Sequence, residues 1–210
     1  MKKFALTLTI LFGFVGTTSA TMKGDAEAGK TKAITCTACH GVDGNKTLDN
    51  THPKLAGQNE EYLVKQLQDF KTASQTAGKE GRNNMIMNGQ AAMLSDQDMR
   101  DIAAYFASLN MSAGATPEEA IPQGKLLYTA GDASRSIPAC TACHGPRGEG
   151  LGLAGFPRIA YQNATYLENQ LKSFRDGTRA NDMNKMMRDI ASKLTDEDIK
   201  ILAQYMQGLH

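Results

Sequence analysis

Apolar residues recur at intervals of three and four along two pairs of segments, which is the spacing of helices with one buried face. The first pair has apolar positions at Leu63, Leu67 and Phe70, and at Leu167, Leu171 and Phe174. The second pair has them at Ile102, Tyr105, Phe106 and Leu109, and at Leu202, Tyr205, Met206 and Leu209. No segment shows a convincing alternation of apolar and polar residues, so the pattern predicts an all-α fold.

Polar residues mark where these helices should begin. Asn59 and Asn163 stand at the expected N-cap positions of the first pair. The second pair opens with Ser95-x-x-Asp98 and Thr195-x-x-Asp198, a capping-box-like start that uses aspartate in place of glutamate. Gly177 is the expected C-cap of the helix that contains Phe174.

The two halves of the chain are copies of one module. A shift of 104 residues aligns the segments up to Phe70, and a shift of 100 aligns those from Asn84 onward. The first copy therefore carries four extra residues (104 − 100), which we expect in a loop over residues 72–81. Small and turn-forming residues from Ser112 to Pro117 predict the boundary, giving domains 21–112 and 118–210 joined by a linker at 113–117.

The N-terminus has the features of a cleavable signal peptide over residues 1–20. Lys2 and Lys3 precede an apolar run from Phe4 to Val15, and small residues lead to an expected cleavage after Ala20. The run is shorter than the ~20 residues of a spanning helix, so we expect export to the periplasm. Cleavage removes two lysines and takes the net charge from +1 to −1, which argues against nucleic acid as a partner.

All four cysteines lie in two identical pentads, Cys-Thr-Ala-Cys-His. The pattern C-x-x-C-H is typical of covalent haem attachment, because two thiols one turn apart can each form a thioether with a vinyl group. A zinc site or a redox dithiol is the alternative, but two identical pentads without a spare cysteine favour two haem c groups. The predicted thioether and proximal-ligand residues are Cys36, Cys39 and His40, and Cys140, Cys143 and His144.

The sixth iron ligand decides whether a haem carries electrons or offers an open site to a substrate. Of the methionines that precede the last helix of each copy, only Met87 and Met187 coincide in the repeat, so we favour this pair. Two further histidines, His52 and His210, have no counterpart in the other copy, which disfavours bis-histidine ligation. The methionines kept as alternatives are Met85 and Met186.

Two other repeated residue types are candidates for the haem surroundings. Pro53 and Pro157 follow the pentads at equal intervals, and their carbonyls could accept the second ring N–H of the histidines. The residues alone do not separate this role from that of ordinary turn prolines. Arg82 and Arg179 precede the methionine segments and could pair with haem propionates, or could be plain surface arginines.

Tandem C-x-x-C-H modules, with P-x-[LI]-A-x-Q before a helix and a methionine before a final aromatic helix, resemble the dihaem cytochrome c4 family over essentially the whole mature chain. The resemblance implies two class I cytochrome c domains related by a pseudo-twofold axis, with the propionates facing each other across the interface. It implies His/Met ligation at His40 and Met87 and at His144 and Met187. It also favours the carbonyl role for the two prolines.

The resemblance further implies an electron carrier that accepts electrons from a cytochrome bc complex or a similar donor and passes them to a terminal oxidase. The alternatives are a dihaem peroxidase-like oxidoreductase, which needs one open iron position, and a haem subunit of a larger dehydrogenase. We expect a non-enzymatic, monomeric protein, free in the periplasm or loosely associated with the membrane.

Overall fold

The computed structural model describes residues 23–210, and the predicted signal peptide at 1–20 lies outside this range. Within it the chain forms helices and loops, with two isolated β-bridges and no strand, so the all-α prediction is confirmed. The helices of the first half are α1 (Ala26–Lys32), η1 (Ala33–Thr35), α2 (Thr37–His40), α3 (Glu60–Gln75), α4 (Met85–Ala91) and α5 (Asp96–Ser108). Those of the second half are η2 (Glu118–Ala120), α6 (Ile121–Ala130), η3 (Ala133–Arg135), α7 (Thr141–His144), η4 (Gly152–Ala154), α8 (Ala164–Arg175), η5 (Met183–Lys185), α9 (Met186–Ala191) and α10 (Asp196–Gln207).

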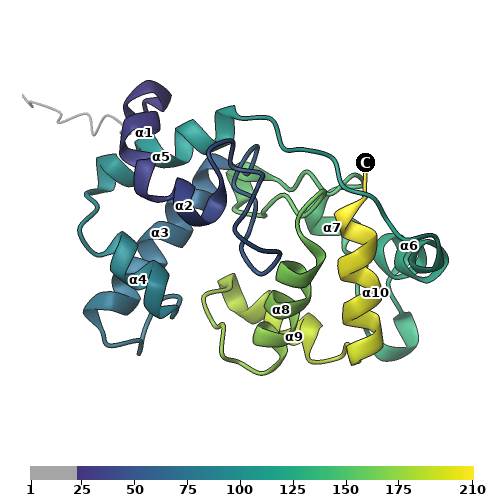
Figure 1. Cartoon of the computed structure of the whole chain (residues 1–210). Helices are drawn as coiled ribbons and strands as arrows, with labels where there is room; N and C mark the ends of the chain where they lie inside the picture. Colours follow the sequence, from purple (N-terminus) through teal and green to yellow (C-terminus); the bar gives the residue numbers. More distant parts are fainter. Residues whose placement is uncertain (1–22) are drawn as a thin grey trace, which may run out of the picture.

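Two groups of helices lie side by side, with α1 to α5 in one and α6 to α10 in the other (Figure 1). The chain between them, over residues 110–117, has no regular secondary structure and runs along one edge of the molecule. Each group buries its own apolar core, which includes Ile102 and Phe106 in the first and Leu202 and Met206 in the second. These residues come from the final helices that the sequence pattern predicts.

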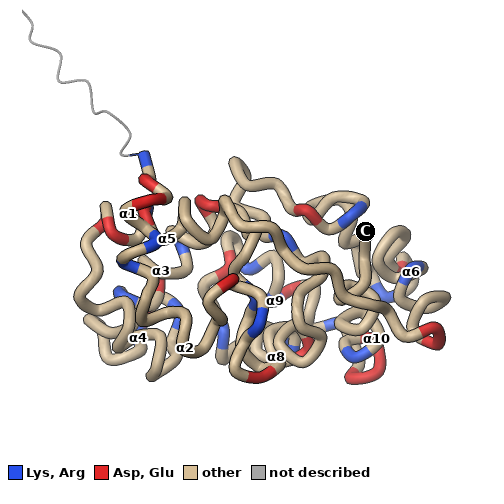
Figure 2. Tube along the Cα trace, turned by 45° about the horizontal axis from the view of Figure 1, so that its top comes forward, with Lys and Arg blue, Asp and Glu red and all other residues tan. Residues whose placement is uncertain are grey.

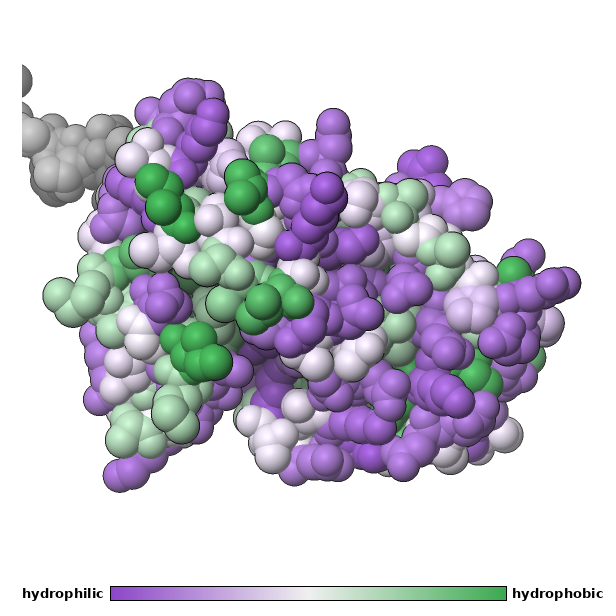
Figure 3. All heavy atoms as spheres, in the orientation of Figure 1, coloured by the Kyte–Doolittle hydropathy of each residue, from purple (hydrophilic) through white to green (hydrophobic). Residues whose placement is uncertain are grey.

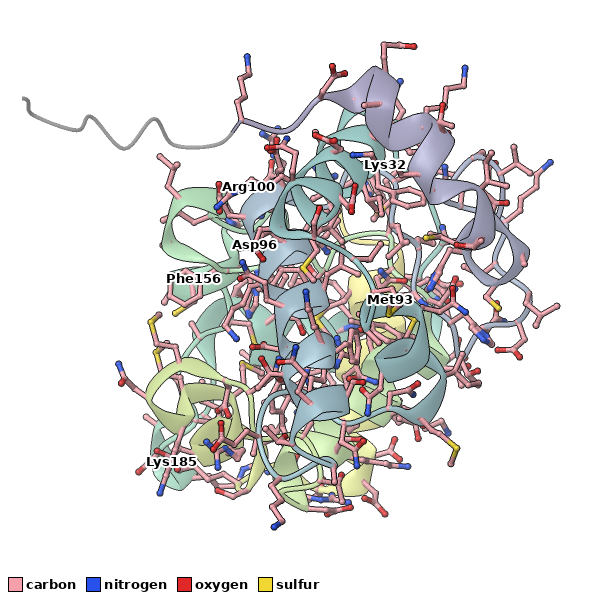
Figure 4. All side chains as sticks on the ribbon, turned by 90° about the vertical axis from the view of Figure 1, so that its left-hand side faces the viewer. Lys32, Met93, Asp96, Arg100, Phe156 and Lys185 are labelled. Atoms are coloured by element: carbon pink, nitrogen blue, oxygen red, sulfur yellow. The ribbon has the colours of Figure 1, made fainter. Side chains whose placement is uncertain are left out.

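Each domain joins its first helix to its last through a glycine. A Cβ atom on Gly29 of α1 would lie 1.9 Å from the carbonyl oxygen of Asp101 in α5. A Cβ atom on Gly124 of α6 would lie 2.5 Å from the Cβ atom of Tyr205 in α10. Only a residue without a side chain permits this approach. In the first domain Lys32 of α1, labelled in Figure 4, adds ion pairs to α5. Its Nζ lies 2.6 Å from a carboxylate oxygen of Asp98 and 2.6 Å from one of Asp101.

The predicted helix starts are correct. In α5 and α10 the hydroxyls of Ser95 and Thr195 accept the N–H of the aspartate three residues on, and that aspartate accepts the N–H of the cap, so both capping boxes are complete. Helices α3 and α8 begin directly after Asn59 and Asn163. Neither asparagine side chain caps its own helix, however, because both reach the other domain.

The sequence analysis expected the four extra residues of the first copy in a loop, but they lie in helix α3. Helix α3 has 16 residues and α8 has 12, so the additional length appears as one more turn of α3, up to Gln75. Thr72 to Gln75 continue the helix because this stretch contains no glycine or proline that would end it. The chain turns only at Ala77 and Gly78, both with positive φ.

The surface differs between the domains. Basic and acidic residues are interspersed along both (Figure 2), whereas several hydrophobic groups lie on the face of the first domain and fewer on that of the second (Figure 3). The most exposed apolar residues of the first domain are Ile34, Val42, Leu48, Met85, Ile86 and Met93. Across residues 23–210, the structure contains no helix with the length and apolar character that crossing a membrane requires.

Candidate functional site

Each pentad forms a single helical turn, α2 in the first domain and α7 in the second. The N–H of His40 donates to the carbonyl of Cys36 at 3.0 Å, and that of His144 donates to the carbonyl of Cys140 at 2.9 Å. This i,i+4 bond brings the first cysteine and the histidine to the same side of the turn. The four cysteines form no disulfide.

The first cysteine of each pentad packs against the apolar core of its domain. Burial raises the pKa of the Cys36 thiol and raises that of Cys140 to about 11, so both are neutral at neutral pH. A thioether is also uncharged, so attachment of a vinyl group at these sulfurs places no charge against the core.

The two histidines are buried and oriented by the prolines that the sequence analysis singled out. Nδ1 of His40 lies 2.9 Å from the carbonyl oxygen of Pro53, and Nδ1 of His144 lies 3.0 Å from that of Pro157. A carbonyl can only accept, so Nδ1 carries the proton and the lone pair of Nε2 is left for a metal. Burial lowers the pKa of both histidines, which favours this neutral form.

The unmatched histidine His52 packs against His40, with ring centroids 6.2 Å apart and the rings near perpendicular. Phe156 takes the corresponding place beside His144 at 6.3 Å. Phenylalanine cannot bind a metal. We therefore interpret the equivalent positions of His52 and Phe156 as packing positions beside the proximal histidines. Nδ1 of His52 also lies 3.0 Å from Asp49 Oδ1.

The candidate sixth ligands lie on the short helices α4 and α9. Met87 and Met187 are half-buried, whereas Met85 is 89% exposed. Met186 is half-buried like its neighbour Met187, so burial separates the alternatives in the first domain but not in the second.

The two arginines lie at the domain interface, where each contacts both domains. Nη1 of Arg82 donates to Oε1 of Gln66 in its own domain at 2.9 Å. Nη2 of the same residue donates to the hydroxyl of Tyr166 at 3.1 Å and to Oε1 of Gln170 at 2.8 Å, both in the second domain.

Arg179 repeats this arrangement in the opposite direction. Its Nη1 donates to Gln170 of its own domain at 2.8 Å, and its Nη2 donates to Tyr62 at 3.0 Å and to Gln66 at 3.1 Å in the first domain. The set is therefore close to twofold symmetric, as the duplication implies. We call it the interface cluster, and its members are Tyr62, Gln66, Arg82, Tyr166, Gln170 and Arg179.

The interface cluster contains two positive charges, of which Arg179 is buried and Arg82 is half-buried. The guanidinium groups stack over Phe70 and Phe174, at 4.9 and 4.4 Å from the ring centroids. Among residues 23–210, no carboxylate lies within ion-pairing distance of either arginine. Burial raises the pKa of Tyr166, but the two arginines outweigh it and lower that pKa. Shielded cations without carboxylate partners suit the carboxylate groups of haem propionates.

The sequence analysis missed the tyrosines and glutamines of the interface cluster. The repeat was the signal that could have found them. Tyr62 and Gln66 match Tyr166 and Gln170, although helix formation does not require these residue types at those positions. Gln58-Asn59 before α3 and Gln162-Asn163 before α8 also match in the repeat. The structure brings both pairs to the domain interface.

Comparisons with known proteins agree with this architecture. The cytochrome c family model matches residues 26–110 and again residues 122–210. A cytochrome c4 from Pseudomonas aeruginosa is 46% identical over the full length of both chains. The crystal structure of reduced cytochrome c4 from Pseudomonas stutzeri superposes with a TM-score of 0.86 at 48% identity, covering 89% of this chain and all of that one. A thiosulfate dehydrogenase electron acceptor from Stutzerimonas stutzeri is 39% identical, covering 84% of this chain and 80% of that protein.

Two tandem cytochrome c domains define this chain as a dihaem electron-transfer cytochrome, with two covalently attached haem c groups. Within that class, the identity and the full-length match to its relatives show that the chain belongs to the cytochrome c4 family. The sequence analysis made the same assignment from the pentads and the repeat, and it is confirmed.

Proposed function

We propose that the protein is a periplasmic carrier of single electrons, in which His40 and Met87 ligate one haem iron and His144 and Met187 the other. The observation that carries the proposal is the neutral, carbonyl-bonded state of both histidines, which leaves Nε2 available. Six-coordinate haems have no open position for a substrate, and a methionine ligand favours a high potential.

The interface cluster supports transfer between the two haems. Arg82 and Arg179 each bond to side chains of both domains, so groups bound to them would lie close to the domain boundary. When bound, each haem supplies reversible Fe(III)/Fe(II) chemistry. The protein orients His40 and His144 and holds their ring protons at Nδ1. Met87 and Met187, or their neighbours Met85 and Met186, would supply the sulfur ligands.

We propose a cytochrome bc complex or a similar respiratory complex as donor and a terminal oxidase as acceptor. The similarity to a thiosulfate dehydrogenase electron acceptor favours a second candidate donor. This donor is a dehydrogenase that delivers electrons to the chain. The proposal includes export by a signal peptide at residues 1–20. The mature chain then consists of domains at 21–112 and 118–210, joined by a linker at 113–117.

Optical spectroscopy of the purified holoprotein tests the ligation. We expect two haems per chain, reduction by one electron each, and the weak near-infrared band of methionine bound to ferric haem at the intensity of two sites. A band of half that intensity, with a high-spin component that binds cyanide rapidly and turns over peroxide, would support the peroxidase alternative and contradict a pure carrier.

A further inference from the structure

Gln162 of the second domain forms a two-point contact with the backbone of the first. Its Oε1 accepts the N–H of Lys54 at 2.8 Å, and its Nε2 donates to the carbonyl of Lys54 at 2.9 Å. The next residue, Asn163, donates to the carbonyl of His52 at 2.8 Å. These three hydrogen bonds hold the residues on both sides of Pro53, whose carbonyl accepts the ring proton of His40.

Gln58 and Asn59 of the first domain repeat the contact on the second. Gln58 Oε1 accepts the N–H of Arg158 at 2.8 Å, and its Nε2 donates to the Arg158 carbonyl at 2.8 Å. Asn59 donates to the carbonyl of Phe156 at 2.9 Å. These bonds flank Pro157, whose carbonyl faces Nδ1 of His144.

The two contacts are built and shielded rather than incidental. Gln58 is 5% exposed, Gln162 is 3% exposed and Asn163 is 8% exposed. Each glutamine Oε1 also accepts the N–H of the asparagine that follows it, at 2.9 Å in both copies, so the contact is fixed to the start of α3 or α8. In Figure 1 the loops between α2 and α3 and between α7 and α8 lie against each other between the two domains.

We propose that the Gln-Asn pair of each domain positions the proximal histidine of the other domain's haem, by fixing the proline carbonyl that receives its ring proton. The proposal rests on the ligation given under Proposed function. A firm Nδ1–H···O=C bond makes the imidazole a stronger donor to the metal and stabilises the ferric state. Loosening the carbonyl weakens that bond, so the potential of the haem in the other domain rises.

The test uses the full-length holoprotein with Asn163→Ala, and separately with Gln162→Ala. Potentiometric titration followed by NMR, with each haem's methyl signals assigned through their contacts to its own domain, reports the two potentials separately. We expect the haem held by His40 to shift upward, changing its oxidised-to-reduced ratio two- to tenfold at a fixed potential, where tenfold is about 59 mV for one electron. The haem held by His144 should keep its potential.

Two sets of variants serve as controls. Asn59→Ala and Gln58→Ala should reverse the pattern, shifting the haem held by His144 alone. Thr47→Val removes the Thr47 hydroxyl, which accepts from Nδ2 of Asn163 at 3.0 Å and donates to the carbonyl of Asp49 at 2.8 Å. It leaves the hydrogen bonds to His52 and Lys54 in place and should shift neither haem. As a second measurement, the Nδ1 proton of His40 should exchange faster with water in Asn163→Ala than in the wild type.

The outcomes separate this proposal from the ligation on which it depends. If the wild type lacks methionine–iron bands or a histidine-bound iron, the proposed function fails. If the wild type shows both and the Asn163 and Gln162 variants change neither the His40 haem nor its ring proton, the positioning role is wrong. Equal shifts of both haems would also overturn it, because they would indicate a general opening of the interface.

Discussion

The methionine segments of the two copies differ in the backbone that precedes the favoured ligands. Met87 lies in the first turn of α4, and its N–H donates to the side chain of Asn84 at 3.0 Å. Met186 and Met187 come directly after two residues with left-handed backbone, Asn184 and Lys185, at φ 52° and 60°. A left-handed pair costs conformational energy and resets the direction of the chain, so Met187 and its neighbour Met186 are not placed by helix register alone.

Alanine substitutions distinguish the favoured methionines from their neighbours. Met87→Ala should remove half of the methionine–iron band intensity, produce one high-spin haem and lower that haem's potential, because methionine ligation raises it. Met85→Ala should leave the spectrum unchanged, since its side chain is 89% exposed. In the second domain, Met187→Ala should have the effect of Met87→Ala and Met186→Ala should not. Loss of the band in Met85→Ala or Met186→Ala would assign the ligand to that residue.

Substitution of an interface arginine should lower the haem potentials. A positive charge disfavours the ferric state, and unit charges roughly 10 Å apart interact by about 1.7 kcal/mol at an effective dielectric constant of ~20. We therefore expect Arg179→Gln to lower at least one potential by an amount of order 1 kcal/mol, measured by voltammetry of the holoprotein. Arg147→Gln is the matched control, because the Arg147 side chain is 70% exposed and pairs with Glu149. An equal effect of both variants would show that overall charge, not the interface cluster, sets the potential.

At the scale of elements, the N-terminus of α10 is tied to η3 as well as capped. Asp198 accepts hydrogen bonds from the hydroxyl and the N–H of Thr195, at 2.8 and 2.9 Å. It also pairs with Arg135 at 2.6 Å. The hydrogen bond from Arg135 is the largest influence on the pKa of Asp198, and the hydrogen bonds from Thr195 act in the same direction. Together they outweigh the effect of burial and lower that pKa.

Asp198→Asn should therefore destabilise the holoprotein by about 0.5–2 kcal/mol at pH 7, the range found when a helix loses a capping side chain. A carboxyl whose native pKa is lowered stabilises the fold above its ordinary pKa of about 3.9, and this contribution is lost as the pH falls through the native value. The difference between wild type and variant should thus shrink below about pH 4 in urea denaturation. Glu197→Gln removes a charge from the same turn at an exposed position that caps nothing, and should change stability little at either pH. A constant difference at all pH values would contradict the assignment.

The elements that the sequence could predict are those whose own residues determine them. The starts of α5 and α10 follow from their capping boxes, and those of α3 and α8 from the apolar spacing that follows Asn59 and Asn163, and the structure begins all four where the pattern indicates. The extra turn of α3 was not predictable from the offset, which locates an insertion but not its conformation. The short helices α4 and α9 carry no full apolar stripe, so their spacing gave no helix.

For the whole molecule, the side-chain contacts between the domains are what the sequence did not reveal. Asn59 and Asn163 have the residue type and position of N-caps, yet their side chains bond the other domain. A local pattern cannot distinguish these uses, because the choice depends on a partner about 100 residues away. The repeat did preserve both asparagines and both glutamines, but only the assembled interface gives the reason.

The interlocked loops predict that damage to one domain is felt in the other. Leu202→Ala removes a side chain that is 3% exposed in the second core, and such changes cost about 2–5 kcal/mol. When that domain opens more often, Gln162 and Asn163 release the loop over residues 47–54 of the first domain. Hydrogen exchange followed by mass spectrometry on the holoprotein should then show faster exchange in this loop as well as in α10. Leu153→Ala, at a position 99% exposed, is the control and should change neither. Faster exchange confined to α6 to α10 would show that the domains open independently, because an anchored loop has to lose protection when its anchor unfolds.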